Sequence, residues 1–288
     1  MIGRAFCYGA ASIVNAIPTG KGCAFGINLR TEAEVKLTNE AGVFEVFIKN
    51  DPKESGKLAE NCARLVLKKF GLEKEYGARI ITNSEIPISK GLKSSSTAAN
   101  AVVLACYRAL NKKYNDLEII NLGVDASLLA KTSITGAFDD ACASYLGGVV
   151  ATDNTKRKIL KRYKIDKNYD VIIYVPKKKI KKSELNLRRA RKLSKFSELA
   201  FELALRKNYS LAMLINSLAW SDYLKLTSEI ELDSLKFGAI AAGISGTGPS
   251  VVILAPKDRA YDIIEMIKTK DKNAEIIKTK LNNHKKAY

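Results

Sequence analysis

The sequence is almost without histidine, and this scarcity excludes several kinds of catalytic site. Its single histidine, His284, lies in the polar C-terminal segment LNNHKKAY, where we expect a solvent-exposed side chain. Ser-His-Asp and Cys-His nucleophilic sites need a histidine in the body of the fold, and so do histidine-rich zinc sites. We therefore expect any general base to be a carboxylate or, less readily, a lysine or a tyrosine.

Paired cysteines and long apolar runs are also missing. The five cysteines are scattered without a C-x-x-C pair, which is typical of free thiols that pack as small hydrophobes in a reduced compartment. No span approaches the ~20 apolar residues of a membrane helix. With 47% hydrophobic residues available for a core, we expect a soluble cytoplasmic protein without a membrane partner.

Acidic residues are outnumbered, 30 against 48 basic ones, so the net charge is +18. The segment 156–182 is especially rich in Lys and Arg. A basic stripe of this kind either binds nucleic acid through phosphate contacts or forms a solvated lysine-rich surface. We favour the solvated surface and expect no nucleic-acid partner. The basic field also favours small anionic substrates.

Hydrophobic periodicity predicts strands and helices mixed through the first half of the chain. Residues 32–38 and 43–48 have strand patterns and are separated by a turn, so we expect a hairpin. Asp51-Pro52-Lys53-Glu54 carries an N-cap, a proline and a carboxylate in the order that begins a helix, which Gly71 would end. Further strands are expected at 79–82 and 149–152.

A helix over 94–110 is built almost wholly from small or apolar residues, which predicts burial on most of its faces. The order of the remaining elements suits helices packed on an antiparallel sheet. We place a domain boundary in the basic stretch, giving domains 1–155 and 156–288. Other helices are expected at 116–131, 138–146, 183–226 (two or three) and 258–268, and other strands at 171–175, on both sides of 243–248 and at 274–281.

No P-loop is present, because Gly20-Lys21 is followed by Gly22 and Gly56-Lys57 by Leu58, where a Ser or Thr is required. A different kind of phosphate-binding segment, residues 87–97, leads into the expected buried helix. Its glycine lets the backbone turn, its serines are expected to cap the helix, and the first-turn N–H groups can hold an anion. The expected ATP-binding residues are Pro87, Ile88, Ser89, Lys90, Gly91, Leu92, Lys93, Ser94, Ser95, Ser96 and Thr97.

Lys93 would add a cation beside the phosphates, and the hydroxyl of Ser95 would complete the shell of a Mg²⁺ ion. An ordinary serine-rich N-cap without any ligand is the alternative.

Read with Ile86, this segment resembles the second motif of the GHMP kinases, P-x-x-x-G-L-G-S-S-A, and departs from it at Lys93 and Ser96. The variant GLKSSS is similar to that of the archaeal shikimate kinases in this superfamily. Two segments downstream resemble further family motifs, 135–144 with the catalytic aspartate and 243–250 with the glycine-rich loop. The run 11–22 is similar to the archaeal shikimate kinase start, although it lacks the P-G-K/R form of the first motif.

The resemblance implies roles for individual residues. Asp139 takes the position of the aspartate that accepts or orients the proton of the acceptor hydroxyl. We prefer it to Asp140, since adjacent helical residues do not share a face. Asp125 corresponds to a Mg²⁺-binding acidic residue, and Lys21 to a lysine that pairs with the catalytic aspartate. The phosphate or acceptor loop comprises Gly243, Ser245, Gly246, Thr247 and Gly248.

The expected fold is therefore α+β, a two-domain GHMP kinase with an N-terminal mixed β/α domain and a C-terminal ferredoxin-like α/β sandwich. The expected activity is transfer of the ATP γ-phosphate to the 3-hydroxyl of shikimate with Mg²⁺, with Lys21 as first candidate for the carboxylate anchor. Homoserine kinase or another GHMP activity is the alternative within the family, because fold does not settle substrate. A nucleic-acid-binding protein is the alternative from another class.

Overall fold

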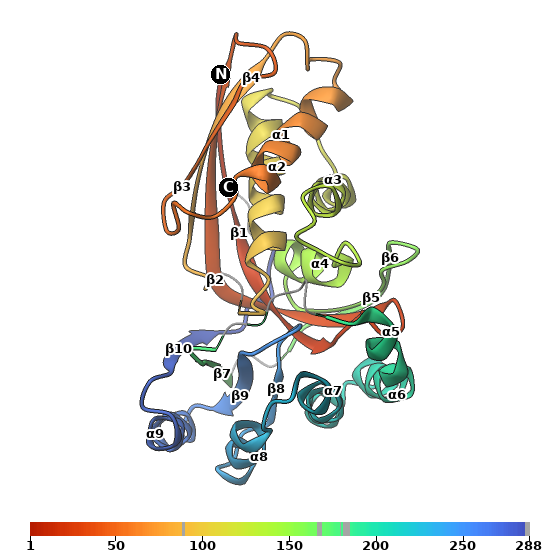
Figure 1. The fold of residues 1–288 in the computed structure, drawn as a ribbon, viewed down its shortest axis with the longest axis vertical. Coiled ribbons are helices and arrows are strands. Elements are labelled where there is room, and N and C mark those ends of the chain that lie inside the picture. Colours follow the sequence, from red (N-terminus) through yellow and green to blue (C-terminus); the bar gives the residue numbers. More distant parts are fainter. Residues whose placement is uncertain (88–89, 166–168, 179, 181–184, 286–288) are drawn as a thin grey trace.

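Two β-sheets, each covered by helices, organise the chain (Figure 1). The computed structural model describes residues 1–87, 90–165, 169–178, 180 and 185–285. The upper part of the molecule in Figure 1 is built around a six-stranded sheet, and the lower part around a four-stranded one.

The first sheet is centred on its longest strand. The six strands are β1 (Ile2–Val14), β2 (Lys21–Thr38), β3 (Phe44–Ile48), β4 (Gly77–Ser84), β5 (Val149–Asp153) and β6 (Lys158–Tyr163). Strand β2 pairs antiparallel with β1 along one edge and with β4 and β5 along the other. The order β3-β4-β2-β5-β6 completes the sheet, and only the β3–β4 pair is parallel.

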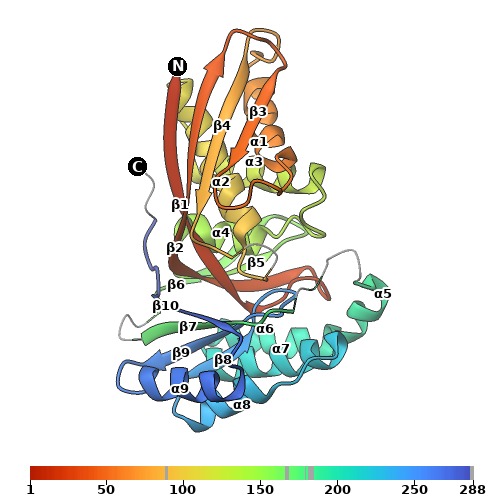
Figure 2. The same cartoon turned by 60° about the vertical axis from the view of Figure 1, so that its left-hand side comes forward.

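Four helices lie on one side of this sheet (Figure 2); the first, second and fourth pack against its strands, and the third packs on these helices. They are α1 (Lys57–Lys69), α2 (Ser94–Ala109), α3 (Asp116–Leu129) and α4 (Phe138–Leu146). Helix α2 lies against β1 and β2 and is buried along nearly its whole length, as its composition predicted. Because small residues dominate α2, neighbouring helices approach it closely, and the N-termini of α2 and α4 meet near the centre of the molecule.

The second sheet is wholly antiparallel, in the order β10-β7-β9-β8. The chain order β-α-β-β-α-β with this strand order is the ferredoxin-like arrangement. The predicted α+β fold with two sheets is therefore confirmed. Its elements are β7 (Tyr169–Val175), α5 (Leu187–Ala190), η2 (Arg191–Leu193), α6 (Ser194–Leu205), α7 (Tyr209–Leu224), α8 (Glu229–Lys236), β8 (Ala241–Ile244), β9 (Val251–Pro256), α9 (Ala260–Lys270) and β10 (Glu275–Lys280).

One hydrophobic cluster joins the two parts of the molecule. Ile13 and Phe25 from the first sheet pack in it with Ile173 of β7, Phe201 of α6 and Met213 of α7. Since burial of these side chains stabilises both parts at once, the lower ends of β1 and β2 are held against the second sheet and its helices. The division at 155/156 stays a prediction, and β5 and β6 on either side of it pair in the first sheet.

The predicted hairpin of 32–38 and 43–48 is wrong. Strand β3 pairs in parallel with β4, which lies between β3 and β2. Two parallel strands need a crossover connection, and α1 supplies it. The turn at 39–42 is real, but a local turn signal does not reveal which strand is inserted between its neighbours.

The predicted helix start at Asp51 is also wrong. Helix α1 begins at Lys57 after Gly56. The side chain of Asp51 instead accepts a hydrogen bond from the Lys53 N–H, and its carbonyl accepts one from Glu54. Asp and Asn close turns by the same hydrogen bonds that cap helices, so the pattern was ambiguous.

Three simpler predictions agree with the structure. All five cysteines are buried free thiols, and the side chain of His284 is exposed. Within the described residues, every helix is too short or too polar to cross a bilayer.

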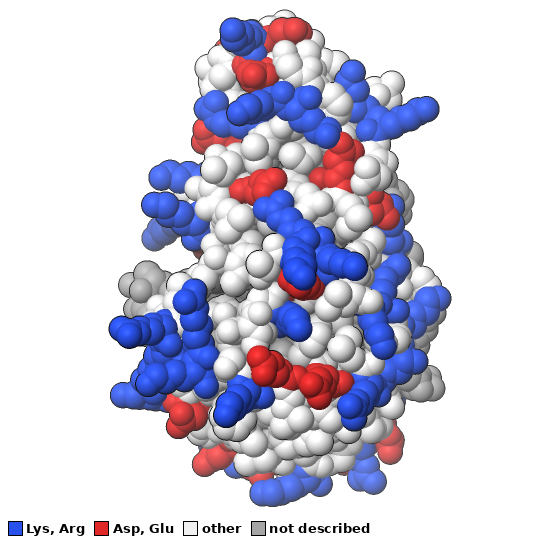
Figure 3. All heavy atoms as spheres, turned by 90° about the vertical axis from the view of Figure 1, so that its right-hand side faces the viewer, with Lys and Arg blue, Asp and Glu red and all other residues white. Residues whose placement is uncertain are grey.

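The basic stretch is partly engaged in structure. Arg157 pairs with Asp125, and the guanidinium of Arg162 donates hydrogen bonds to the carbonyls of Leu146 and Gly147. Figure 3 shows Lys and Arg side chains dispersed over this side of the molecule with acidic groups among them. The absence of a nucleic-acid partner stays a prediction.

Candidate active site

A cavity of about 460 Å³ opens where the N-termini of α2 and α4 meet the end of β1 and the loop that follows β8. Its walls are rich in hydroxyl groups and contain, among the described residues, one lysine and the three carboxylates of Glu54, Asp139 and Asp140. The polar side chains that line it include Ser12, Asn15, Lys93, Ser94, Ser95, Ser96, Ser127, Thr132, Ser133, Thr135, Asp139, Asp140 and Thr247.

The predicted phosphate segment reaches this cavity in its central part. Residues 91–96 line the wall, whereas Ile88 and Ser89 lie outside the described residues and Pro87 is not in the wall. The ammonium of Lys90 is turned away and donates hydrogen bonds to the carbonyls of residues 176–178 after β7. The hydroxyl of Thr97 turns inward and donates to the Lys93 carbonyl at 3.0 Å.

The N-terminus of α2 is not capped by a serine, contrary to the prediction. The N-cap is Lys93, whose backbone is left-handed with φ 65°, and no side chain caps the helix there. The first N–H groups of a helix have no partner within it, and the helix dipole favours an anion beside them. The arrangement therefore offers backbone donors from Ser94, Ser95 and Ser96 to a phosphate group.

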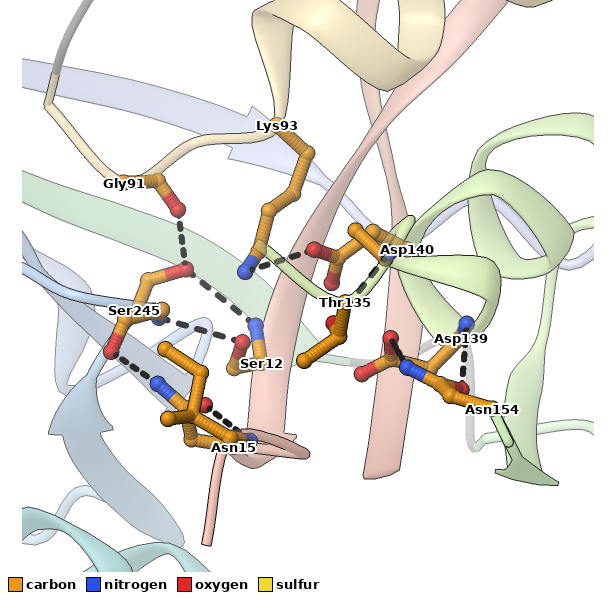
Figure 4. A network of polar contacts seen from close by, with 12 residues as sticks. Ser12, Asn15, Gly91, Lys93, Thr135, Asp139, Asp140, Asn154 and Ser245 are labelled. Carbon is orange, nitrogen blue, oxygen red and sulfur yellow. Dashed lines mark hydrogen bonds and ion pairs between the residues drawn. The ribbon is translucent and has the colours of Figure 1, made fainter. Parts of the chain in front are cut away.

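Lys93 forms an ion pair across the cavity. Its Nζ lies 3.0 Å from Oδ2 of Asp140, and each side chain is only 10% exposed (Figure 4). The other oxygen of Asp140, Oδ1, is buried and has no hydrogen-bond partner in the described part of the chain. A buried acceptor without a hydrogen-bond partner lowers the stability of the fold. Oδ1 of Asp140 is therefore suited to bind a cation or a hydrogen-bond donor of a ligand.

Asp139 occupies the first turn of α4 and is 3% exposed. Its Oδ1 accepts a hydrogen bond from the Asn154 amide at 2.7 Å. Burial, and then the neighbouring Asp140 carboxylate, raise the pKa of Asp139 from 3.8 to about 7, although Lys93 and the Asn154 hydrogen bond oppose them. A carboxyl whose pKa is near neutrality is matched to a general base.

Two cysteines near Asp139 do not offer an alternative nucleophile. Burial, followed by the charge of Asp139, raises the pKa of the Cys23 thiol far above its usual range, and burial raises that of Cys142 likewise. Because only the thiolate is a strong nucleophile, these thiols are unreactive packing groups.

The glycine loop after β8 is tied to the N-terminal strand and to the phosphate segment (Figure 4). The Ser12 N–H donates to Oγ of Ser245, the Gly246 N–H donates to Oγ of Ser12, and Ser245 Oγ donates to the Gly91 carbonyl at 2.8 Å. The Asn15 amide donates to the Gly246 carbonyl at 2.9 Å. These hydrogen bonds attach the glycine loop to the end of β1 and to the phosphate segment.

Three residues of this loop, Gly246, Thr247 and Gly248, line the cavity. Of the other predicted loop residues, Ser245 is a buried support, and Gly243 lies in β8 outside the wall. A Cβ at Gly246 would lie 2.6 Å from Nζ of Lys93, and its φ is 60°. Glycine is therefore needed there for the backbone to pass beside the lysine.

Lys21 and Asp125 are not brought to the cavity. Gly22 faces Asp139, and since successive strand residues point to opposite faces, the exposed Lys21 points away from it. Asp125 on α3 pairs with Arg157 at 2.6 Å and is 42% exposed at its side chain. Among the described residues that line the cavity, the cation beside the two aspartates is Lys93.

The sequence reasoning missed Ser12, Asn15 and Asn154. Ser12 and Asn15 lie within the run 11–22, whose resemblance gives neither of them a role, and Asn154 lies in a turn after a strand. Each acts through hydrogen bonds to residues distant in the chain, for which a single sequence carries no signal.

The residues present fit a magnesium ion brought by a nucleotide. No group of three His, Cys, Asp or Glu side chains suited to a metal occurs in the part of the chain that the structure describes. Mg²⁺ needs only one or two protein ligands when phosphates and waters supply the rest. Asp140 and Ser95 both line the cavity and carry oxygen atoms suited to Mg²⁺, and Oδ1 of Asp140 has no hydrogen-bond partner among the described residues.

Comparison with known families gives two matches along this chain. The model described as GHMP kinases N terminal domain matches residues 57–148, and the one described as GHMP kinases C terminal matches residues 226–273. The first match includes the α2 and α4 termini, and the second includes the loop after β8.

Solved structures of this family share the fold. The homoserine kinase of Cytophaga hutchinsonii has a TM-score of 0.77 at 18% identity and covers 100% of this chain and 97% of its own. The mevalonate kinase of Methanococcus jannaschii has a TM-score of 0.74 at 21% identity, covering 98% of each chain. At these identities the likeness shows the fold alone.

Curated relatives are closer in sequence. The protein named shikimate kinase from Methanosarcina acetivorans is 41% identical over 98% of this chain and 94% of its own length. The one from Pyrococcus furiosus is 39% identical over 84% of this chain and 87% of its own. The alignment with the Methanosarcina acetivorans protein spans nearly the whole of this chain. The chain therefore belongs to the GHMP kinase family.

Proposed function

We propose that this protein is a shikimate kinase, which transfers the γ-phosphoryl group of ATP to the 3-hydroxyl of shikimate and releases ADP and shikimate 3-phosphate. The observation that carries the proposal is the buried Asp139 beside the Lys93–Asp140 pair, at the terminus of a helix suited to phosphate. The shikimate kinase names of the archaeal relatives support the choice of acceptor.

The nucleotide phosphates are proposed to lie against the N-terminus of α2. Backbone N–H groups of Ser94 to Ser96 would face the phosphates there, and the lysine at the N-cap adds a positive charge. Phosphoryl transfer depends mainly on positioning and on neutralising charge at the transferred group. In this proposal Ser94 to Ser96 position the phosphates, and Lys93 neutralises their charge.

Asp139 is proposed to face the acceptor hydroxyl. It lines the cavity close to Lys93 and Asp140, so a hydroxyl beside Asp139 would also lie near the lysine that neutralises phosphate. In its ionised form Asp139 accepts the hydroxyl proton as the O–P bond forms. The raised pKa makes this carboxylate basic enough to hold the proton transiently.

Magnesium would be held by Asp140 and Ser95 together with phosphate oxygens and water. When bound, the ion neutralises phosphate charge during transfer. Every other role in the proposed mechanism belongs to the chain itself.

The test is an ADP-coupled assay in which shikimate, homoserine, mevalonate and galactose are offered separately with MgATP. We expect turnover of shikimate alone, and a product whose phosphate is on the 3-oxygen by ³¹P and ¹H NMR. Robust turnover of homoserine without turnover of shikimate would contradict the proposed acceptor while leaving the kinase assignment in place.

A further inference from the structure

Asn154 makes two contacts with the catalytic aspartate from the turn that follows β5. Its Nδ2 donates to Asp139 Oδ1 at 2.7 Å, and its Oδ1 accepts from the Asp139 backbone N–H at 3.1 Å (Figure 4). The asparagine is 5% exposed and Asp139 is 3% exposed. One amide therefore fixes both the side chain and the backbone of the same aspartate.

The orientation of this amide is set by a third residue. The hydroxyl of Thr152, which is fully buried in β5, donates to Asn154 Oδ1 at 2.7 Å. Because the amide oxygen receives donors from both Thr152 and the Asp139 backbone, the NH₂ group must be the one that faces the carboxylate. The Asn154 N–H donates to the Gly20 carbonyl at 2.7 Å, which anchors the turn to the start of β2.

The second carboxylate oxygen is placed by packing. Oδ2 of Asp139 lies 2.3 Å from the position that a Cβ on Gly22 would occupy, so the missing side chain of Gly22 provides its room. Asp139 is thus held by hydrogen bonds at Oδ1 and by close packing at Oδ2. Such a carboxylate has few alternative rotamers.

We propose that Asn154 is the positioning residue of the proposed catalytic base: it binds Oδ1 so that Oδ2 of Asp139 is presented to the acceptor hydroxyl. The inference deepens the proposed function and rests on the role given there to Asp139. It also explains why an amide is required, since an amide supplies a donor to the carboxylate and an acceptor to the backbone at once.

The matched test compares Asn154 with another buried asparagine remote from the cavity. Asn283 is 3% exposed, accepts from the Ile165 N–H at 3.0 Å and donates to the Ile165 carbonyl at 2.8 Å. The substitution Asn→Asp keeps the shape at both sites and replaces the NH₂ donor by a carboxyl oxygen, which donates only when protonated, so both variants are measured at a pH above the range in which kcat rises. Both variants are expected to lose thermal stability, because each leaves a buried acceptor unpaired.

Kinetics separate the two roles. We expect Asn154→Asp to lower kcat by about 10²-fold, the scale of a misplaced catalytic group, with KM for ATP unchanged. Asn283→Asp is expected to keep the kcat of the unmodified enzyme. A wild-type kcat in Asn154→Asp, or an equal loss in both variants, would overturn the proposal.

Thr152 provides a second route should Asn154→Asp not fold. Thr152→Val removes the hydroxyl that orients the amide, and Thr152→Ser retains it. We expect a lower kcat only in the valine variant, at unchanged KM for ATP, and equal kcat values in the two variants would count against the proposal. All values are ratios to wild type with the acceptor that wild type phosphorylates, so a failure on shikimate would reject the proposed substrate and not this inference.

Discussion

Nζ of Lys93 lies 3.0 Å from Oδ2 of Asp140, joining the N-cap of α2 to the first turn of α4. Both side chains are 10% exposed, so the pair is largely removed from water. A buried charge is retained when it is paired, and removing one partner leaves the other uncompensated. The pair therefore keeps a cation beside the helix terminus that is proposed to hold phosphate.

Replacing Lys93 by Met is expected to lower kcat/KM for ATP by at least ~10²-fold, because it removes the positive charge nearest the proposed phosphate site. Steady-state kinetics with an ADP-coupled assay would measure the effect. Lys21→Met is the control, since the exposed Lys21 points away from Asp139 and should leave kinetics unchanged. A large loss in Lys21→Met with none in Lys93→Met would restore the role predicted from sequence.

Asp139→Asn is expected to lower kcat by at least ~10²-fold, the scale of a lost general base, with ATP affinity largely intact. Asp140→Asn should act differently, since it removes the partner of Lys93 and weakens nucleotide binding. Near-normal turnover in Asp139→Asn would transfer the proposed role to Asp140 or indicate that no base is needed. Single-turnover rates and nucleotide titrations would separate the two effects.

The pH dependence follows from the raised pKa of Asp139, about 7 in the free enzyme. A base acts in its ionised form, so kcat/KM for the acceptor should rise with pH below about 7 and level off above it. The same carboxyl binds its proton more tightly when folded than when unfolded. Its contribution to stability is thus present at low pH and is lost as pH rises through 7. A kcat/KM profile that is flat from pH 5.5 to 8.5 would exclude Asp139 as the titrating base.

Local sequence patterns identified those parts of the candidate site that each lie within one continuous segment of the chain. The buried helix α2, the aspartates at the start of α4 and the loop 246–248 each appear as a continuous motif, and the structure brings them to one cavity. Composition alone was sufficient for α2, since a run of small and apolar residues has to be buried.

The directions of side chains were not predictable in the same way. The resemblance implies that Lys21 pairs with the aspartate, but the strand pleat turns Gly22 and not Lys21 toward Asp139. Asn154 reaches Asp139 only because β5 returns antiparallel beside β2. The hairpin prediction is wrong for the same reason, because β4, which is distant in the chain, lies between β3 and β2 in the sheet.

Asp125→Asn tests the metal role that the resemblance implied. Asp125 is ion-paired with Arg157 on a partly exposed surface, where such pairs contribute about 0–1 kcal/mol. We expect a small decrease in the midpoint of thermal unfolding and an unchanged dependence of kcat on Mg²⁺ concentration. An increase of tenfold or more in the Mg²⁺ concentration needed for half-maximal rate would place Asp125 at the metal after all.

Gly22→Ala should lower kcat without removing any group that takes part in the chemistry. The new Cβ would lie 2.3 Å from Oδ2 and 2.6 Å from Cγ of Asp139, distances at which one of the two must move. Gly22 pairs with Thr152 of β5, and the next residue, Cys23, pairs with both β1 and β5, so the aspartate is the group expected to shift. A displacement of this size is expected to lower kcat by about 10²-fold.

Gly42→Ala is the matched control for this prediction. Gly42 has a φ of 77° and open space around it, so alanine there is strained but touches nothing. We expect it to cost about 1 kcal/mol of stability and to leave kcat unchanged. Comparing unfolding midpoints with kcat for both variants separates backbone strain from displacement of Asp139. If Gly22→Ala turned over at the wild-type rate, the Oδ2 atom beside it would not be the one that meets the acceptor.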